Sequence, residues 1–370
     1  MRVGCPKEIK NHEYRVGLTP ESAAELVRAG HDVFLETKAG EGIGAPDSVY
    51  EKVGVKILPT ADAVFETAEM IVKVKEPQPV EIARLKPHHV LFTYLHLAPD
   101  PEQAEGLMKS GATCIAYETV TDKDGRLPLL KPMSEVAGRM SIQVGAHYLE
   151  KANGGRGVLL GGVPGVQPAH IVILGAGVAG YNAAQIAVGM RARVTVFDKN
   201  PARLEELDRE FNGRLETIYS TKAAVEEAVQ DADVVVGAVL VAGAAAPKLI
   251  TRAMLKTMRP GSVLVDISID QGGCFETSHA TTHADPVFNV DGVIHYCVAN
   301  MPGAVSRTSA FALNNATLPF TLALANKGYR QALQDDPHLA GGLNVYEGAI
   351  AHEAVAKDLG KPFKRPSWLG

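Results

Sequence analysis

The sequence has 370 residues, of which 46% are hydrophobic and 21% are charged, and its formal net charge is -5. This length predicts about two domains, because it exceeds the size that a single hydrophobic core usually reaches. The composition excludes a largely disordered chain. The mildly acidic net charge makes nucleic acid an unexpected partner, and no apolar run approaches the roughly 20 residues that a membrane span needs. The four cysteines lie far apart without a CxxC spacing, which is typical of reduced thiols. These features predict a soluble cytoplasmic protein.

The first third of the chain alternates short apolar runs with amphipathic segments. Strands are predicted at residues 31–36, 55–58, 70–75, 89–96 and 112–119. Helices are predicted at residues 20–30, 61–68, 79–86 and 99–111, which have helical spacing and proline or acidic starts. This alternation predicts a mostly parallel sheet with helices on both faces.

Three polar residues stand at the ends of these apolar segments. Arg15 precedes the first predicted helix, and Lys75 and His96 close two of the predicted strands. An arginine fork suits a carboxylate, a lysine supplies a point charge and an imidazole exchanges a proton, so the three suit a small anionic substrate. Each of them alone is more often a solvated or structural residue, and their spacing does not show that they converge. We interpret Glu118, at the end of the next strand, as a surface acid rather than as a group that supports a site.

A longer helical segment at residues 134–154 leads into a glycine-rich stretch at residues 154–170. So many glycines do not form a regular element, and this stretch is therefore predicted to be a hinge or a boundary.

A second series of strands and helices opens with a glycine fingerprint. The apolar strand at residues 170–174 runs directly into Gly175, Gly177 and Gly180, and a helix follows. These glycines suit a tight turn, a close approach of the backbone to a pyrophosphate and close helix packing, while the helix N-terminus favours negative charge. The order of these features predicts a dinucleotide-binding site.

Asp198 ends the next predicted strand, at about the spacing of 20 residues that this fingerprint has. Its carboxylate would accept hydrogen bonds from the adenosine ribose and would repel a 2′-phosphate, which favours NAD over NADP. Lys199 and Arg203 are nearby cations that weaken this preference.

The later strands, predicted at residues 234–240, 262–268 and 293–300, each lead into a segment poor in helix formers. Ligands of open parallel sheets bind beyond the carboxyl ends of the strands, so these loops are predicted to hold the nicotinamide and its reaction partner. Asp270 stands two residues past the second of these strands, beside glycines. It is either a catalytic base or a turn-forming aspartate.

Residues 301–328 form a largely apolar segment with helical stretches, interrupted by Pro319. We interpret it as a helix that packs between domains or subunits. The histidines show no metal-ligand spacing, so no metal site is predicted.

Six segments together carry a resemblance to a known family. They are, in chain order, MRVGCPKEIKNHEYRVGLTP, IVKVKEP, LFTYLHLA, LPLLKPMSEVAGRMS, GAGVAG and DISIDQGG. Over essentially its whole length the sequence resembles the family of alanine dehydrogenase and the NAD-binding subunit of transhydrogenase. The resemblance implies an α/β fold with two Rossmann-like, doubly wound parallel-sheet domains. It places an NAD-binding domain at residues 131–304, inserted between a substrate domain at residues 1–130 and a C-terminal segment at residues 305–370 that returns to the first domain.

The resemblance also implies the roles of individual residues. His96 and Asp270 take the catalytic positions, while Arg15 and Lys75 take positions that bind the substrate carboxylate and carbonyl. The remaining positions of the substrate pocket are Tyr94, Met133 and Asn300. The cofactor-binding positions are Ser134, Gly175, Gly177, Val178, Ala179, Gly180, Asp198, Lys199, Arg203, Ser220, Val239, Leu240, Ile267, Asn300 and Met301.

The implied reaction is the reversible oxidative deamination of L-alanine to pyruvate and ammonia by a homohexamer, with NAD as the hydride acceptor. His96 would serve as acid and base. Asp270 would orient or deprotonate the attacking water and would hold the ammonium. Three alternatives remain open. A transhydrogenase subunit would not need the set of Arg15, Lys75 and His96, a D-2-hydroxyacid dehydrogenase would carry its proton-transfer histidine in the nucleotide domain, and an NAD-binding regulator would show no turnover.

Overall fold

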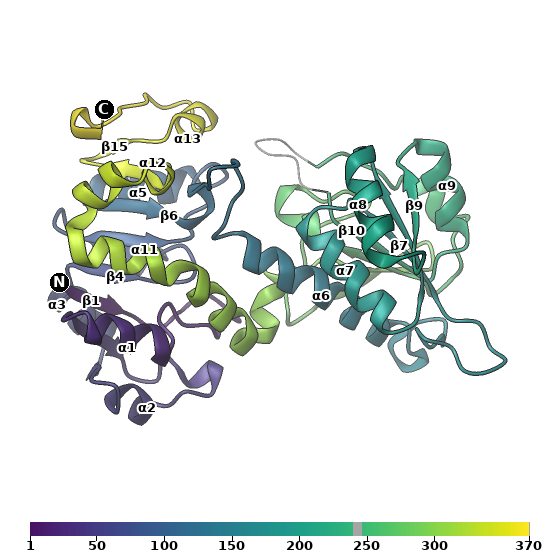
Figure 1. Ribbon diagram of the computed structural model, residues 1–370, viewed down its shortest axis with the longest axis horizontal. Coiled ribbons are helices and arrows are strands. Elements are labelled where there is room, and N and C mark those ends of the chain that lie inside the picture. The colour runs from purple at the N-terminus through teal and green to yellow at the C-terminus, as the bar shows by residue number, and fades with distance from the viewer. Residues whose placement is uncertain (240–245, 370) are drawn as a thin grey trace. The chain divides into compact units, whose positions relative to one another are not determined.

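The computed structural model describes residues 1–239 and 246–369, and these form two compact units. Met1–Met133 together with Gly303–Gly370 form the first unit, and Ser134–Pro302 form the second. Each unit is a β-sheet flanked by helices (Figure 1). The predicted α/β class with two doubly wound sheets is confirmed, and so is the return of the C-terminal segment to the first unit.

The sheet of the first unit combines both ends of the chain. Its strands are β1 (Arg2–Cys5), β2 (Asp32–Glu36), β3 (Lys56–Leu58), β4 (Met70–Val72), β5 (Val90–Thr93), β6 (Thr113–Ala116), β14 (Leu343–Tyr346) and β15 (Ala349–Ile350). Their order is β15-β14-β6-β5-β4-β1-β2-β3. The strands from β1 to β6 are parallel, whereas β14 runs antiparallel to β6 and β15 runs antiparallel to β14.

Helices connect these strands or follow the last of them. They are α1 (Pro20–Arg28), α2 (Asp47–Glu51), α3 (Ala61–Thr67), α4 (Pro79–Ile82), α5 (Pro101–Ser110), α11 (Ser306–Asp335), α12 (Pro337–Ala340) and α13 (Glu353–Asp358), with the 3₁₀ helices η1 (Glu41–Ile43), η2 (Tyr117–Thr119) and η6 (Ser367–Leu369). Local sequence explains their starts, since Thr19 and Asp100 accept N-terminal backbone N–H groups of α1 and α5, and each is followed by proline.

The strand order of the first unit reverses beside β1. From β1 the chain adds β2 and β3 on one side and then returns to add β4, β5 and β6 on the other side. The carboxyl ends of β1 and β4 therefore flank a topological switch point, where open α/β sheets bind ligands. The sequence patterns predicted no strand at β1, because four residues are too short a run to show a period.

Two predicted strands end earlier than their apolar patterns indicate. β4 and β5 end three residues before Lys75 and His96, which therefore lie in loops beyond the strands rather than at strand ends. Side-chain carboxylates take the backbone donors there. Glu8 accepts the N–H of Val74 at 2.7 Å, and Glu118 accepts the N–H of His96 at 2.6 Å, in place of further strand pairing.

The long helix α11 packs against the core of the first unit. Its buried residues Leu313, Leu324 and Leu333 belong to the same hydrophobic cluster as residues of β1 and β2. Figure 1 shows this helix, in yellow-green, across the purple and blue strands of that unit. The predicted interruption at Pro319 is wrong, because the helix continues through it and the non-helical backbone lies at Gly328, whose φ of 73° suits glycine.

The second unit is a Rossmann-like sheet. Its strands are β7 (His170–Leu174), β8 (Arg193–Asp198), β9 (Glu216–Tyr219), β10 (Val234–Gly237), β11 (Val263–Asp266), β12 (Val287–Val290) and β13 (Val293–Tyr296), in the order β12-β13-β11-β10-β7-β8-β9. All pairs are parallel except β12 with β13. The helices are α6 (Lys131–Tyr148), which begins in the first unit, α7 (Val178–Gly189), α8 (Pro201–Phe211), α9 (Lys222–Gln230) and α10 (Arg252–Leu255), with η3 (Lys151–Asn153), η4 (Ile267–Gln271) and η5 (Met301–Val305).

The glycine-rich stretch at residues 154–170 is not a boundary. It lies inside the second unit, which begins at Ser134. Gly162 and Gly165 have φ angles of 57° and 86°, so glycine serves here to form tight turns.

The helices within residues 1–239 and 246–369 include none with the length and apolar character that crossing a membrane requires.

Candidate functional site

The predicted substrate residues of the first unit gather at one edge of its sheet. Arg15 follows β1, Lys75 follows β4, and Tyr94 and His96 follow β5, so all four lie beyond carboxyl ends of strands at or next to the switch point. The rings of Tyr94 and His96 stack, with centroids 5.7 Å apart and 10° between their planes. The spacing in the sequence could not show that these residues lie near one another. The strand order does, because β1, β4 and β5 are neighbours in the sheet.

Arg15 is a buried cation that a buried carboxylate orients. Its Nε and Nη2 donate to the two carboxylate oxygens of Glu13 at 2.7 and 2.5 Å, and it is only 2% exposed. Its Nη1 lies 3.1 Å from Sδ of Met133, another predicted pocket residue. Burial disfavours the charged form of Arg15, but the hydrogen bonds and the negative charge of Glu13 outweigh the effect of burial and raise the pKa of Arg15. The two-point pairing fixes the plane of the guanidinium.

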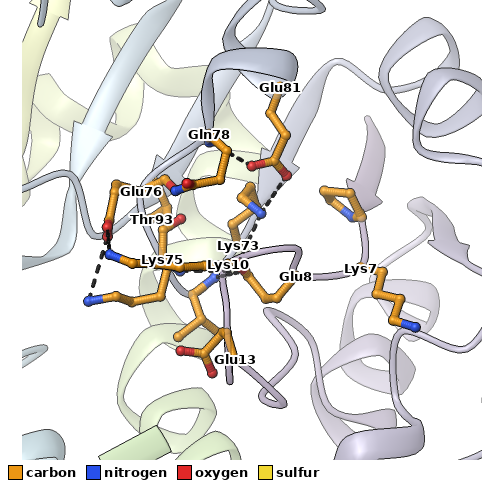
Figure 2. Close-up of polar contacts among 12 residues, drawn as sticks. Lys7, Glu8, Lys10, Glu13, Lys73, Lys75, Glu76, Gln78, Glu81 and Thr93 are labelled. Carbon is orange, nitrogen blue, oxygen red and sulfur yellow. Dashed lines mark hydrogen bonds and ion pairs between the residues drawn. The ribbon is translucent and has the colours of Figure 1, made fainter. Parts of the chain in front are cut away.

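A buried ion cluster supports the loop after β4. Lys73 is 0% exposed, and its Nζ lies 3.1 Å from Oε2 of Glu8 and 2.7 Å from Oε1 of Glu81. Figure 2 shows Glu81 reaching toward the Lys73 ammonium. Burial raises the pKa of Glu8 despite the Lys73 charge, whereas the two carboxylates overcome burial and raise the pKa of Lys73. Because Glu8 also accepts the N–H groups of Val74 and Lys75, at 2.7 and 3.4 Å, the cluster holds the backbone that carries Lys75.

The Lys75 ammonium faces a carboxylate that it shares with a second lysine. Its Nζ lies 3.6 Å from Oε2 of Glu76, and Lys10 bonds to the other oxygen (Figure 2). Burial opposes ionisation of Glu76, but the two lysines outweigh it and lower the pKa of Glu76. Two cations therefore share this one carboxylate.

His96 has an exposed side chain on a tightly held backbone. Its φ of 48° lies in the left-handed region, and its N–H donates to Oε1 of Glu118 at 2.6 Å. The N–H of Leu95 donates to both oxygens of the same carboxylate, at 3.3 and 3.2 Å. The interpretation of Glu118 as a surface acid is therefore wrong, because its half-buried carboxylate supports the loop that carries His96.

A cleft of about 310 Å³ opens beside Arg15. Its lining residues are Lys7, Glu8, Glu13, Tyr14, Arg15, Lys38, Ala39, Glu41 and Gly42. This volume lies at the lower end of the range for small-molecule sites, and Arg15 is the predicted substrate residue among those that line the cleft.

The sequence patterns did not lead to a prediction of the buried charged residues, which are Glu8, Glu13, Lys73 and Glu81. Lys73 carried a signal, because a lysine inside an apolar strand pattern is buried only when it is paired. Glu8 and Glu13 carried a weaker one, as acids in the loop that also bears Arg15. Glu81 carried none, since it looks like an ordinary acid of an amphipathic helix.

The second unit gathers its glycine fingerprint at the carboxyl end of β7, where β7 and β10 flank the switch point. Gly175 has a φ of 99°, and Gly177 is the exposed N-cap of α7, whose first turn includes Val178 and Ala179. A Cβ at Gly180 would lie 1.8 Å from the carbonyl oxygen of Gly175, whereas a Cβ at Gly177 would meet open space. The close helix packing and the open N-terminus fit a dinucleotide pyrophosphate.

Replacing Gly180 by alanine is expected to raise the Kd for NAD about tenfold or more. The added Cβ would push α7 away from β7 and so move the N-terminus of α7 away from the pyrophosphate. A loss of about 1.4 kcal/mol of that contact is tenfold in affinity. Calorimetric titration with NAD measures this. Gly189→Ala is the matched control in the same helix, since a Cβ there meets nothing within 4 Å. Equal NAD affinities of the two variants would contradict a role of the glycine spacing.

Asp198 lies at the end of β8, beside the fingerprint loop. Its Oδ2 accepts the N–H of Ala176 at 2.7 Å, and its Oδ1 accepts the N–H of Asn200 at 2.8 Å. The nearby Arg203 donates from Nε to the carbonyl oxygen of Ala176 at 2.8 Å, and its Nη1 pairs with Glu206 at 2.8 Å. The Arg203 guanidinium is therefore already engaged with protein groups.

Asp270 lies in η4, four residues beyond β11 rather than two, and its side chain is exposed. Asp266 at the end of β11 holds this turn by accepting the N–H groups of Ser268 and Cys274 at 3.1 and 2.9 Å. Lys248 donates to the two carbonyl groups that follow the turn, at 2.5 and 2.7 Å. A turn fixed at both ends presents the Asp270 carboxylate at the edge of the sheet.

The other predicted cofactor residues of the second unit are placed as follows. Lys199 is exposed after β8, Ser220 follows β9, Val239 follows β10, Ile267 opens η4, Asn300 and Met301 follow β13, and Ser134 lies in α6. Leu240 lies outside the described residues. Among the residues that are described, no three or more His, Cys, Asp or Glu side chains are grouped to hold a metal ion.

Comparison with protein families gives two matches that cover most of the chain. Residues 4–137 match the family described as "Alanine dehydrogenase/PNT, N-terminal domain", and residues 141–353 match "Alanine dehydrogenase/PNT, C-terminal domain".

Individual proteins show the same similarity. The chain is 60% identical over 360 residues to "Alanine dehydrogenase" of Halomonas elongata, with 97% of each chain covered, and 56% identical over 363 residues to that of Mycolicibacterium smegmatis, with 98% of each covered. A solved "L-alanine dehydrogenase" is 52% identical, with a TM-score of 0.95 over 97% of this chain and 99% of that one. A solved transhydrogenase from Sinorhizobium meliloti is 27% identical, with a TM-score of 0.82 over 96% of this chain and 100% of that one.

Proposed function

Because this chain belongs to the alanine dehydrogenase/PNT family, we propose that it catalyses the reversible, NAD-dependent oxidative deamination of L-alanine to pyruvate and ammonia. The observation that supports this most directly is the set of Arg15, Lys75 and His96 beyond neighbouring strand ends of the first unit. Such a set suits a substrate that carries a carboxylate and exchanges protons. The first unit is then the substrate domain and the second the NAD domain, in a cytoplasmic homohexamer.

Arg15 and Lys75 bind the carboxylate and the carbonyl of the substrate. Glu13 fixes the guanidinium plane of Arg15, which binds the carboxylate of alanine or pyruvate. Lys75, whose counter-ion Glu76 is shared with Lys10, polarises the carbonyl oxygen of pyruvate. These contacts set the orientation of the α-carbon, and orientation is a large part of the rate that an enzyme supplies.

His96 and Asp270 move protons. Gly177 at the N-terminus of α7 and Asp198 would hold NAD, which would supply the acceptor for the hydride of the alanine α-carbon. His96 exchanges protons at the developing carbonyl oxygen and at the nitrogen, for which an imidazole is suited near neutral pH. Asp270, as a carboxylate, orients the water that attacks the imine and binds the departing ammonium. Met133 beside Arg15 and Tyr94 beside His96 form walls of the substrate pocket in the first unit.

NAD rather than NADP is the proposed cofactor, with Asp198 as the residue that selects it. The Asp198 carboxylate stands where the adenosine ribose is expected, and Arg203 is already bonded to Ala176 and Glu206 rather than poised for a 2′-phosphate.

Replacing Asp198 by asparagine is therefore expected to raise the ratio of kcat/KM for NADP to that for NAD by about tenfold or more. Asparagine keeps an oxygen for the N–H of Ala176 but removes the charge, and a juxtaposed like charge costs several kcal/mol. Steady-state rates with both cofactors measure the ratio. Glu205→Gln, which removes a carboxylate from the exposed face of α8, is the control. An unchanged ratio in Asp198→Asn would show that another residue selects the cofactor.

The proposed activity is tested by NADH formation from NAD with L-alanine, run beside D-alanine, glycine, L-serine, L-glutamate, lactate and NADP. A rate confined largely to L-alanine and NAD is the expected result. NAD binding without turnover would overturn the proposal and favour a transhydrogenase-like subunit or an NAD-binding regulator.

A further inference from the structure

The carboxylate of Glu118 accepts hydrogen bonds from the backbone of His96, the proposed acid and base, and of the residue before it. Glu118 lies in η2, directly after β6, and β6 is the parallel neighbour of β5. Its Oε1 accepts the N–H of His96 at 2.6 Å, and its two oxygens lie 3.3 and 3.2 Å from the nitrogen of Leu95. Two consecutive backbone donors thus point at one carboxylate.

The carbonyl group of Leu95 is also hydrogen-bonded. The side-chain amide of Gln103, which is 6% exposed in α5, donates to the carbonyl oxygen of Leu95 at 2.7 Å. Tyr94, next to it, is anchored by its hydroxyl, which donates to the carbonyl oxygen of Leu129 at 2.5 Å. The segment from Tyr94 to His96 is therefore bonded to η2, to α5 and to the loop that precedes α6.

This restraint acts on a conformation that a histidine does not favour. The φ of 48° at His96 lies in the left-handed region, which costs an L-residue of this kind about 1–2 kcal/mol unless its surroundings impose it. The imidazole itself is exposed, and the ring contact found for it is with Tyr94 at 5.7 Å. The direction of the ring consequently depends on the backbone, and the backbone depends on Glu118.

We infer that Glu118 is a positioning residue, which aims His96 at the substrate by holding the Leu95–His96 peptide in its left-handed turn. This inference rests on the proposed role of His96 in proton transfer. Glu118 does not touch the reacting atoms, so its effect passes through the placement of the imidazole. A misplacement of about 1 Å can cost roughly 100-fold in rate.

The test compares Glu118→Gln and Glu118→Ala with a matched control. Glutamine would keep the length of the side chain but place an amide donor against a backbone donor, and alanine would remove both acceptors. The control is Asp122→Asn, because Asp122 also accepts two backbone N–H groups, those of Asp124 and Arg126, at 2.9 and 2.8 Å in the same unit. Each variant is assayed per active site, after titration of bound NAD, with L-alanine in H₂O and D₂O.

The expected result is a kcat lower by about 10-fold in Glu118→Gln and by about 100-fold in Glu118→Ala, with an unchanged KM for NAD. The solvent isotope effect on kcat is expected to rise, because proton transfer through a misplaced His96 becomes the slow step. Asp122→Asn is expected to match the wild type in both. A kcat per active site and a solvent isotope effect that stay at wild-type values in Glu118→Ala would overturn the inference, as a purely structural role would give that result.

Amide hydrogen exchange provides a readout that needs no turnover. The amides of Leu95 and His96 are expected to be protected in the wild type and to exchange faster in Glu118→Gln, but not in Asp122→Asn. Unprotected amides in the wild type would overturn the inference even if neither Glu118 variant folds. Absence of alanine oxidation by a wild type with protected amides would instead overturn the proposed function and, with it, the role of the restraint in catalysis.

Discussion

Replacing His96 by alanine is expected to lower kcat for L-alanine oxidation by about 10²- to 10⁴-fold, the range that a general acid and base contributes. The exposed imidazole lies beyond the carboxyl end of β5 and makes little contribution to the core. Its loss should therefore leave the fold and NAD binding intact. Single-turnover and steady-state rates of NADH formation, together with the Kd for NAD, measure the effect.

His88→Ala is the matched control for this prediction. His88 is also exposed and lies just before β5, at the opposite end of the same strand. Its replacement is expected to leave kcat near the wild-type value. If His96→Ala oxidised alanine at the wild-type rate while remaining folded, His96 would be a structural residue and proton transfer would have to be assigned elsewhere.

The glycine turn after β7 and the acid at the end of β8 could be predicted from the sequence because their signals are local. Gly175, Gly177, Gly180 and Asp198 lie within one strand-helix-strand segment, and each answers a steric or electrostatic need that its own neighbours create. The structure places them together at the carboxyl end of β7 and β8. The position of Asp270 relative to its strand was predicted less well, since the 3₁₀ turn that carries it depends on the N–H groups of Ser268 and Cys274, which donate to the Asp266 carboxylate.

The backbone contacts of Glu8 and Glu118 could not be predicted, because their partners are distant in sequence. Glu8 bonds to the loop after β4, and Glu118 bonds to the loop after β5. The apolar pattern alone therefore extended both strands to Lys75 and His96, whereas the observed strands stop where these acids take over the backbone donors. Tertiary contacts decided the ends of the strands, and those ends are where the site residues stand.

The C-terminal part of the first sheet was also beyond the sequence patterns. β14 adds to the edge of β6 in the antiparallel direction, and β15 returns along it in a two-residue pairing. Such short strands show no period, and the pairing of β14 joins segments that are far apart in the chain. The resemblance to a family implied the return of this segment, but not its strands.

Replacing Lys73 by methionine is expected to lower the free energy of unfolding by about 3–5 kcal/mol, the usual effect of removing one partner from a buried ion cluster. Methionine fills a similar volume, so packing changes little. The carboxylates of Glu8 and Glu81 would, however, remain buried without the ammonium that lies 3.1 and 2.7 Å from them. Urea denaturation measures the loss. Lys56→Met is the control, because the Lys56–Asp32 pair is exposed and its removal should change stability little.

The sign of the pH dependence distinguishes this cause from a simple packing defect. Burial already raises the pKa of Glu8, and removing Lys73 removes the charge that lowers it, so the pKa in the folded variant rises further. A raised carboxyl pKa in the folded state contributes stability below the unfolded value of about 4.3 that is lost as the pH rises through the folded value. The deficit of Lys73→Met is therefore expected to be larger at pH 8 than at pH 5, and adding Glu8→Gln should recover part of it. A deficit that is equal at both pH values would mean that Lys73 stabilises the loop after β4 by packing rather than by charge.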